Sequence, residues 1–185
     1  MEEMISLGSN CSITYQLNKY NKRQISYPFD WSKITINQLL SVLENNLNDY
    51  ENVFIKKFSK NHEDSYILSN KYNITFAHEI VNKYNLEEFK QIIMKRKKNF
   101  SNITNSTKCF IRIELKQIKE IYIEKLRKLC LLLNKYCENY KLILLVDINC
   151  KINLEINSNI IVKKVVIFEN YKDWKMDYIN WLEIL

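Results

Sequence analysis

The fold of this chain is decided by two apolar runs, Phe110-Ile111-Arg112-Ile113 and Leu142-Ile143-Leu144-Leu145-Val146. Both runs are nearly continuous rather than alternating, which is typical of β-strands covered on both faces. Shorter apolar stretches at about 4–8 and 160–168 are predicted to be strands as well. Helices of crossover length separate most of these strands, and such connections favour parallel pairing. We therefore predict an α/β fold with a mainly parallel central sheet flanked by helices.

The predicted helices lie at about 11–21, 35–47, 85–99, 118–138 and, as a short C-terminal one, 174–184. Capping-box signatures begin two of them, Thr35 with Gln38 and Asn85 with Glu88. Residues 65–78 are predicted to form a small hairpin inserted into this pattern. Because no repeat, linker or change of composition interrupts the chain, we treat residues 1–185 as a single domain.

Composition limits the classes of partner. The chain has 46% hydrophobic residues, enough for a real core, and a formal net charge of +7, which permits anionic partners. However, the lysines are scattered. The one dense run, Lys95-Arg96-Lys97-Lys98, falls at the end of a predicted helix, where cations complement the helix dipole. We interpret it as a solvated helix end, with a phosphate-binding patch as the alternative, and we do not expect a nucleic-acid partner.

The cysteines indicate free thiols. There are five, an odd count, without CxxC or Cys/His metal spacing: Cys11, Cys109, Cys130, Cys137 and Cys150. Most lie within apolar stretches, so we expect them to be buried and reduced, and we expect no metal and no other cofactor. The chain shows neither a signal peptide nor an apolar run near 18 residues. These features predict a soluble, cytoplasmic protein without a membrane partner.

Gly8, the only glycine, lies between a predicted strand and a predicted helix. A lone glycine at such a turn indicates a backbone that needs a positive φ or a close approach to a neighbour. Three residues later, Cys11 begins the helix. The partial positive charge of a helix N-terminus lowers the pKa of a thiol there, so this is the placement expected of a nucleophilic cysteine.

The chain has two histidines. His62 lies in a polar loop, and we interpret it as a surface residue. His78 ends a predicted strand, at the kind of sheet edge where sites form in α/β proteins. A catalytic base is one interpretation of His78, and a structural residue is the simpler one.

Two charged residues lie in apolar surroundings. Asp30 is flanked by Phe29 and Trp31 just after the sole proline, so we expect it to be held in place and shielded from water. The simplest interpretation is a loop carboxylate that accepts hydrogen bonds from nearby backbone amides. Arg112 lies in an apolar run and therefore needs a carboxylate, for which Asp30, Glu114 and Asp147 are the candidates. It could form a structural pair or an anion clamp.

Four stretches carry a resemblance: Ile5-Ser6-Leu7-Gly8-Ser9-Asn10-Cys11, Ser26-Tyr27-Pro28-Phe29-Asp30-Trp31, Phe76-Ala77-His78 and Phe110-Ile111-Arg112. In this order and rough spacing they resemble a family described as putative papain-like cysteine peptidases, which occurs in bacteria and large DNA viruses. The resemblance extends over nearly the whole chain, to a Trp-rich stretch from Asp173 to Trp181.

The resemblance implies site residues. Cys11 would be the nucleophile, His78 its base, and Asp30 the acid that orients the imidazole. Asp147 and Asp173 are alternative acids, because in papain-like enzymes the acid follows the histidine in the chain. The bias towards Asn, Lys, Ile and Tyr suits an AT-rich genome, viral or bacterial. A viral protein would be found in the host cytoplasm or the virion.

Two functions follow as hypotheses. The first is a cysteine-nucleophile hydrolase or transferase that acts on an amide, isopeptide or ester in a protein, peptide or small acyl substrate. Backbone amides at residues 10–12 would stabilise the oxyanion, and Gly8, Asn10, Trp31 and Arg112 would contact the substrate. The alternative is a non-catalytic α/β module that binds an anionic or sugar ligand at the same strand edge. A third possibility is a structural or host-interaction protein whose site has decayed.

Overall fold

The computed structural model describes residues 3–57, 66–76, 85–103, 107–115, 118–151, 158–167 and 173–185. Its central element is a four-stranded sheet in the order β1 (Glu3–Ser6), β5 (Lys108–Ile113), β6 (Tyr140–Asp147) and β7 (Ile160–Val165). Every pairing in this sheet is parallel. The carboxyl ends of β1 and β5 therefore lie at the same edge, and the predicted α/β class is confirmed.

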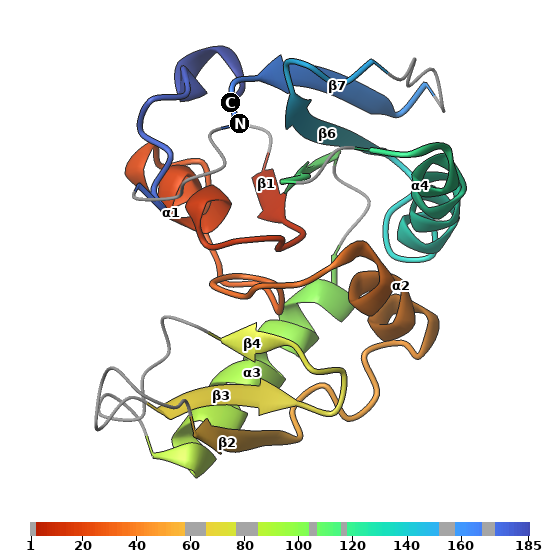
Figure 1. Ribbon diagram of the computed structural model, residues 1–185. Coiled ribbons are helices and arrows are strands. Elements are labelled where there is room, and N and C mark those ends of the chain that lie inside the picture. Colours follow the sequence, from red (N-terminus) through yellow and green to blue (C-terminus); the bar gives the residue numbers. More distant parts are fainter. Residues whose placement is uncertain are drawn as a thin grey trace.

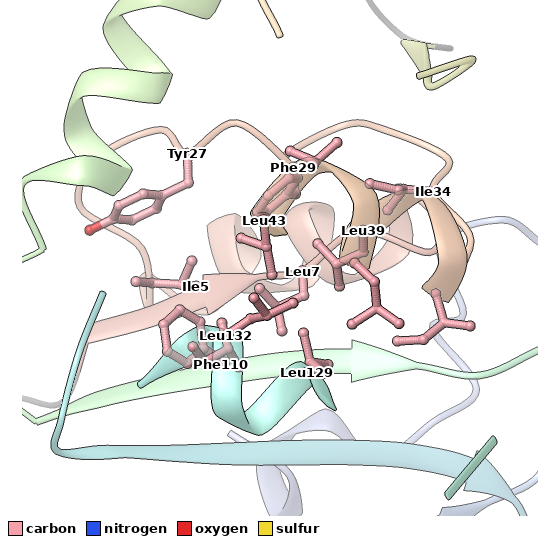
Figure 2. Packing of buried hydrophobic residues seen from close by; sticks show 14 of the residues in the cluster. Ile5, Leu7, Tyr27, Phe29, Ile34, Leu39, Leu43, Phe110, Leu129 and Leu132 are labelled. Atoms are coloured by element: carbon pink, nitrogen blue, oxygen red, sulfur yellow. The ribbon is translucent and has the colours of Figure 1, made fainter. Parts of the chain in front are cut away.

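Helices cover both faces of this sheet (Figure 1). Along β5, Cys109 and Ile111 pack on the side of α1 (Ser12–Lys19), whereas Phe110 packs on the opposite side. That opposite side is covered by α2 (Ile36–Glu44) and α4 (Glu120–Leu133). Figure 2 shows the resulting core, in which side chains of β1 and β5 meet leucines of the two helices. The continuous apolar runs are thus explained by burial on both faces.

Both predicted capping boxes are present. Thr35 accepts a hydrogen bond from the backbone of Gln38 at the start of α2, and the Gln38 side chain returns a bond to the Thr35 backbone. Asn85 and Glu88 do the same at the start of α3 (Leu86–Ser101). These side chains satisfy backbone amides that have no partner within the helix, which explains why each helix begins there.

A second, antiparallel sheet contains the predicted hairpin, β3 (Tyr66–Asn70) and β4 (Thr75–Phe76). It also contains β2 (Val53–Lys57), a strand that the sequence analysis did not predict. The side chains of Phe54 and Ile55 are both exposed in β2, so the alternation that identifies a half-buried strand is missing. The sheet packs against α3, where the rings of Phe76 and Phe89 lie 5.3 Å apart edge to face.

Three predictions about helices are wrong. The chain at 174–184 forms only a 3-10 turn, η1 (Trp181–Glu183), because Met176 has a φ of 55° and cannot continue a right-handed helix. The basic run at 95–98 is not wholly solvated. It lies within α3, which continues to Ser101, and the side chain of Arg96 is buried. α4 also ends at Leu133, five residues before the predicted end at 138.

All five cysteines are free and buried, as predicted. Within the ranges that the structure describes, no helix is both long and apolar enough to cross a membrane.

Candidate active site at the start of helix α1

The turn after β1 requires its glycine for two reasons. Gly8 has a φ of +74°, a conformation that L side chains rarely adopt. In addition, a Cβ atom on Gly8 would lie 2.0 Å from Cγ2 of Ile34, far inside contact distance. Both features predicted for this position, the positive φ and the close approach, are confirmed.

This turn places Cys11 at the N-cap of α1, directly before Ser12. The Cys11 carbonyl accepts the first helical hydrogen bond, from Tyr15 N at 3.0 Å, and 7% of the residue is exposed. The Asn10 side chain caps the same helix, since its Oδ1 atom accepts a bond from Ser12 N at 3.1 Å. The predicted placement of Cys11 between strand and helix is confirmed. Of the three amides expected to stabilise an oxyanion, that of Ser12 is held by Asn10.

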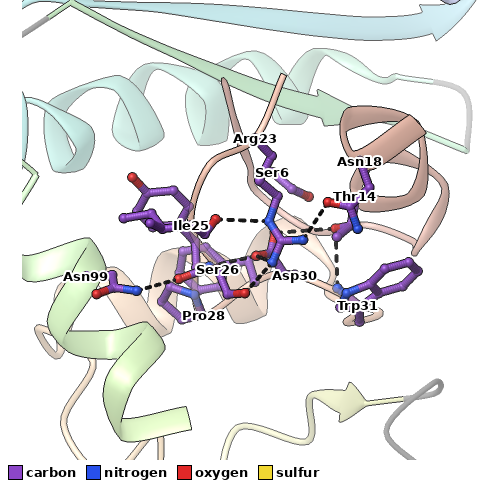
Figure 3. A network of polar contacts seen from close by, with 12 residues as sticks. Ser6, Thr14, Asn18, Arg23, Ile25, Ser26, Pro28, Asp30, Trp31 and Asn99 are labelled. Atoms are coloured by element: carbon purple, nitrogen blue, oxygen red, sulfur yellow. Dashed lines mark hydrogen bonds and ion pairs between the residues drawn. The ribbon is translucent and has the colours of Figure 1, made fainter. Parts of the chain in front are cut away.

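Asp30 is completely buried, and its carboxylate is held by donors from three parts of the chain (Figure 3). Oδ2 lies 2.7 Å from Nη2 of Arg23 and accepts a 2.6 Å bond from Tyr27 N. Oδ1 accepts a longer bond, 3.4 Å, from Thr14 Oγ1. Burial raises the pKa of Asp30, while the Arg23 charge and the Tyr27 amide oppose the rise. The predicted loop carboxylate, held in place and shielded from water, is confirmed.

Thr14 connects this loop to the helix that Cys11 begins. Its Oγ1 atom accepts a bond from Trp31 N at 3.3 Å and donates to Asp30. Residues three apart on a helix lie on the same face, about 5–6 Å apart. Asp30 and Trp31 therefore contact the first turn of α1 on the side where Cys11 begins it.

Backbone strain is concentrated at the same place. Among the described residues other than Gly, Asn and Asp, a left-handed φ occurs at Ser9, Trp31, Leu47 and Met176. Three of these four surround the start of α1: Ser9 precedes it, Trp31 N bonds to Thr14, and Met176 Sδ lies 4.0 Å from Nδ2 of Asn10. Such conformations are costly, and they cluster at functional sites where the surrounding structure enforces them.

Arg112 is buried and pairs with Glu114, one of its three predicted partners. Its guanidinium also donates to the carbonyls of Leu7 at 3.0 Å and Ile34 at 3.2 Å. Arg112 thus connects β5 to Leu7, which precedes Gly8, and to Ile34, which packs against Gly8. All three nitrogens of the guanidinium are engaged, Nε by Glu114 and the two Nη atoms by the carbonyls, so this arrangement supports the structural-pair interpretation.

The alternative acids have local partners. Asp147 accepts bonds from the amides of Asn149 and Ile167, and Asp173 accepts bonds from those of Lys175 and Asp177. Both histidines lie outside the described residues, so the predictions for His62 and His78 stay predictions. No group of three His, Cys, Asp or Glu side chains that could hold a metal ion occurs in the part of the chain that the structure describes.

Sequence analysis missed Arg23 and Thr14. Arg23 also donates to Ile25 O, Asn18 Oδ1 and Ser26 Oγ, so it organises the whole loop around Asp30 (Figure 3). The one available signal was that arginine is rare in this chain, in which lysine is the common cation.

Comparison with known proteins identifies the family of this chain. The family model described as "Putative papain-like cysteine peptidase" matches residues 2–148. The chain belongs to this family. The matched range includes Cys11, Asp30 and Arg112, and the match confirms the resemblance inferred from the four sequence stretches.

A viral protein is similar over almost its whole length. "Uncharacterized protein R408" of Acanthamoeba polyphaga mimivirus is 29% identical over 216 aligned residues, which cover 98% of this chain and 96% of that protein. No solved structure matches the chain significantly. The family model stops before β7 and the C-terminal segment, whereas the viral relative extends over both.

Proposed function

We propose that this protein is a cysteine-nucleophile hydrolase in which the Cys11 thiolate attacks the carbonyl of an amide or ester. The observation that carries the proposal is the position of Cys11 at the start of α1, where three strained residues converge. A thiol there lies in the positive field of the helix N-terminus, which stabilises the thiolate. Membership of a peptidase-like family supports the same chemistry.

The reaction proceeds in two steps. The sulfur forms a bond to the carbonyl carbon, the C–N or C–O bond to the leaving group breaks, and the imidazolium of His78 protonates the leaving group. Water then attacks the thioester, with His78 accepting the water proton, and releases the acid and the Cys11 thiol. Of the backbone amides at residues 10–12, those of Asn10 and Cys11 are the proposed donors to the oxyanion, because the Ser12 amide bonds to Asn10 Oδ1.

His78 is the proposed base because the chain before it is anchored to the site. The amide of Lys33 donates to the Thr75 carbonyl at 2.9 Å, and Lys33 follows Trp31 by two residues. His78 follows Thr75 by three positions in the sequence, a backbone span of at most about 11 Å. The proposed orienting acid is Asp30, through its Oδ1 atom, which accepts the long bond from Thr14. Gly8, Asn10, Trp31 and Arg112 are the proposed substrate contacts.

The test is selective alkylation of the folded protein by iodoacetamide at mildly acidic pH, with the modified thiols identified by peptide mass spectrometry. We expect Cys11 to react before the four other thiols, and we expect His78→Ala to abolish that preference. His62→Ala is the matched control, because it removes the other histidine of the chain. If wild-type Cys11 shows no preference, the hydrolase proposal fails and the non-catalytic alternative is favoured.

A further inference from the structure

A pocket of about 320 Å³ opens beside the turn that leads to Cys11. Ser9 forms part of its wall, together with Ile34 and Ile36 at the start of α2 and Ile121 and Tyr122 at the start of α4. The volume lies within the range of ligand sites, roughly 300–1,000 Å³. It is about twice that of a cavity of roughly 150 Å³ that holds benzene. The pocket can therefore accept a ring-sized apolar group and a polar group attached to it.

The pocket is also electropositive. Its charged lining consists of Lys33, Lys119, Arg112 and Glu114, so three cations and one carboxylate give a formal charge of +2. Arg112 and Glu114 pair with each other, which leaves the two exposed lysines for a ligand. The N-terminal ends of α2 and α4 both contribute lining residues, and the positive ends of two helix dipoles add to the attraction for an anion.

The hydroxyl of Tyr122 belongs to the same wall of the pocket. Tyr122 Oη is inaccessible to solvent and lies against the paired side chains of Arg112 and Glu114. Tyr122 thus supports that pair from the pocket side.

We propose that this pocket binds the C-terminal residue of a peptide substrate, with an apolar side chain among the isoleucines and the free carboxylate towards Lys33 and Lys119. The inference rests on the function proposed above for Cys11. Two residues of backbone span at most about 7 Å, so a group that touches Ser9 lies close enough for the preceding amide to approach Cys11. The pocket then selects which amide the thiolate attacks.

The test measures binding without turnover, in a Cys11→Ser protein, by nuclear magnetic resonance titration of backbone amides. The probes are N-acetylphenylalanine, its neutral carboxamide, and N-acetylglycine, which lacks the ring. We expect the acid to shift the amides of Ser9, Ile34, Ile121 and Tyr122. Loss of the charge and loss of the ring should each weaken binding roughly fivefold or more. Added salt should weaken the binding of the two acids but not that of the carboxamide. Equal affinity of all three probes would overturn the proposal.

Two exposed positions of α4 give a matched pair of variants. Ile121 lines the pocket and Leu131 does not, and each is 68% exposed, so neither substitution by Asp removes a buried contact. Ile121→Asp should lower the affinity for N-acetylphenylalanine roughly tenfold, because it places a carboxylate opposite the carboxylate of the probe. Leu131→Asp should leave this affinity unchanged. Equal effects of the two variants would refute the pocket.

Failure of this inference and failure of the proposed function are distinguishable. Binding of the probes is measured without Cys11, so it does not depend on catalysis. If Cys11 is alkylated selectively but the probes do not bind, only the assignment of the pocket is refuted. If the probes bind but Cys11 shows no selective reactivity, the pocket stands as a ligand site and the hydrolase does not.

Discussion

Asp30 is the residue whose contacts explain the most about the site. Its carboxylate joins the loop that carries Trp31 to α1, through Arg23, Tyr27 and Thr14. The same contacts make Asp30 a structural residue, whichever acid orients His78. A buried charge pair of this kind is costly to break, because the remaining charge stays in the interior without a partner.

Asp30→Asn should therefore destabilise the protein by about 3–5 kcal/mol, the cost of removing one member of a buried pair. The measurement is the free energy of unfolding from urea denaturation. Asp49→Asn is the matched control, because Asp49 pairs with Lys71 on the surface and such pairs contribute only about 0–1 kcal/mol. Similar losses in the two variants would show that the Arg23 pair does not stabilise the loop.

Gly8 allows a second test at the scale of one residue. Gly8→Ala should cost at least about 1–2 kcal/mol for the left-handed φ, and the clash with Ile34 should add to that cost. In a Gly8→Ala/Ile34→Ala double variant the clash disappears while the positive φ remains. We therefore expect the double variant to lose less stability than the two single variants combined. Strictly additive losses would contradict the close approach.

At the scale of elements, the carboxyl of Asp147 at the end of β6 predicts that the stability of the protein depends on pH. The amides of Asn149 and Ile167 hold the pKa of the Asp147 carboxyl below its usual value. A carboxyl whose pKa falls on folding stabilises the protein above its unfolded pKa, about 3.9, and loses that contribution as the pH falls through the lower folded pKa. Asp147→Asn should thus be less stable than wild type at pH 7 but not in acid. A difference that is independent of pH would argue against this assignment.

The elements also show which parts of the structure the sequence could predict. Strands buried on both faces and helices with capping boxes were predictable, because each has a local pattern of residues. β2 was missed because Phe54 and Ile55 are both exposed, and the helix at 174–184 was wrong because Met176 adopts a left-handed φ that its residue type does not signal.

In the candidate site, too, some residues could be predicted from the sequence and others could not. Gly8, Cys11 and the burial of Asp30 were predictable from residue type and local neighbours. The roles of Arg23 and Thr14 depend on contacts between separate segments, and single side chains in a polar loop and a short helix carry no pattern that predicts such contacts. The pocket between the starts of α2 and α4 also forms only when distant segments meet at the sheet edge.

At the scale of the whole molecule, the central sheet separates two cores, one on each face. The core on the α1 side is completed by the C-terminal segment, where the buried Trp181 packs in the same cluster as Ile13 and Leu17. Figure 1 shows this segment beside α1. Lys19 and Gln16 of α1 both bond to Asp177, which adds polar contacts to the same junction. The segment therefore supports the helix that Cys11 begins.

Trp181→Ala should cost about 3–5 kcal/mol, the usual loss for a large aromatic removed from a core. Trp174→Ala is the control, because Trp174 is partly exposed. Unfolding monitored by far-ultraviolet circular dichroism compares the two variants without relying on tryptophan fluorescence. Equal stability of the two variants would mean that the C-terminal segment does not complete the core.

The most direct test of the central claim, that Cys11 is an activated nucleophile, compares its alkylation rate with that of Cys150 in one sample. The two thiols are matched for burial, since 7% of Cys11 and 6% of Cys150 are exposed. The account predicts that Cys11 reacts much faster than Cys150 in the folded protein at mildly acidic pH, and that the two rates converge in urea. Equal protection of both thiols in the folded protein would contradict it.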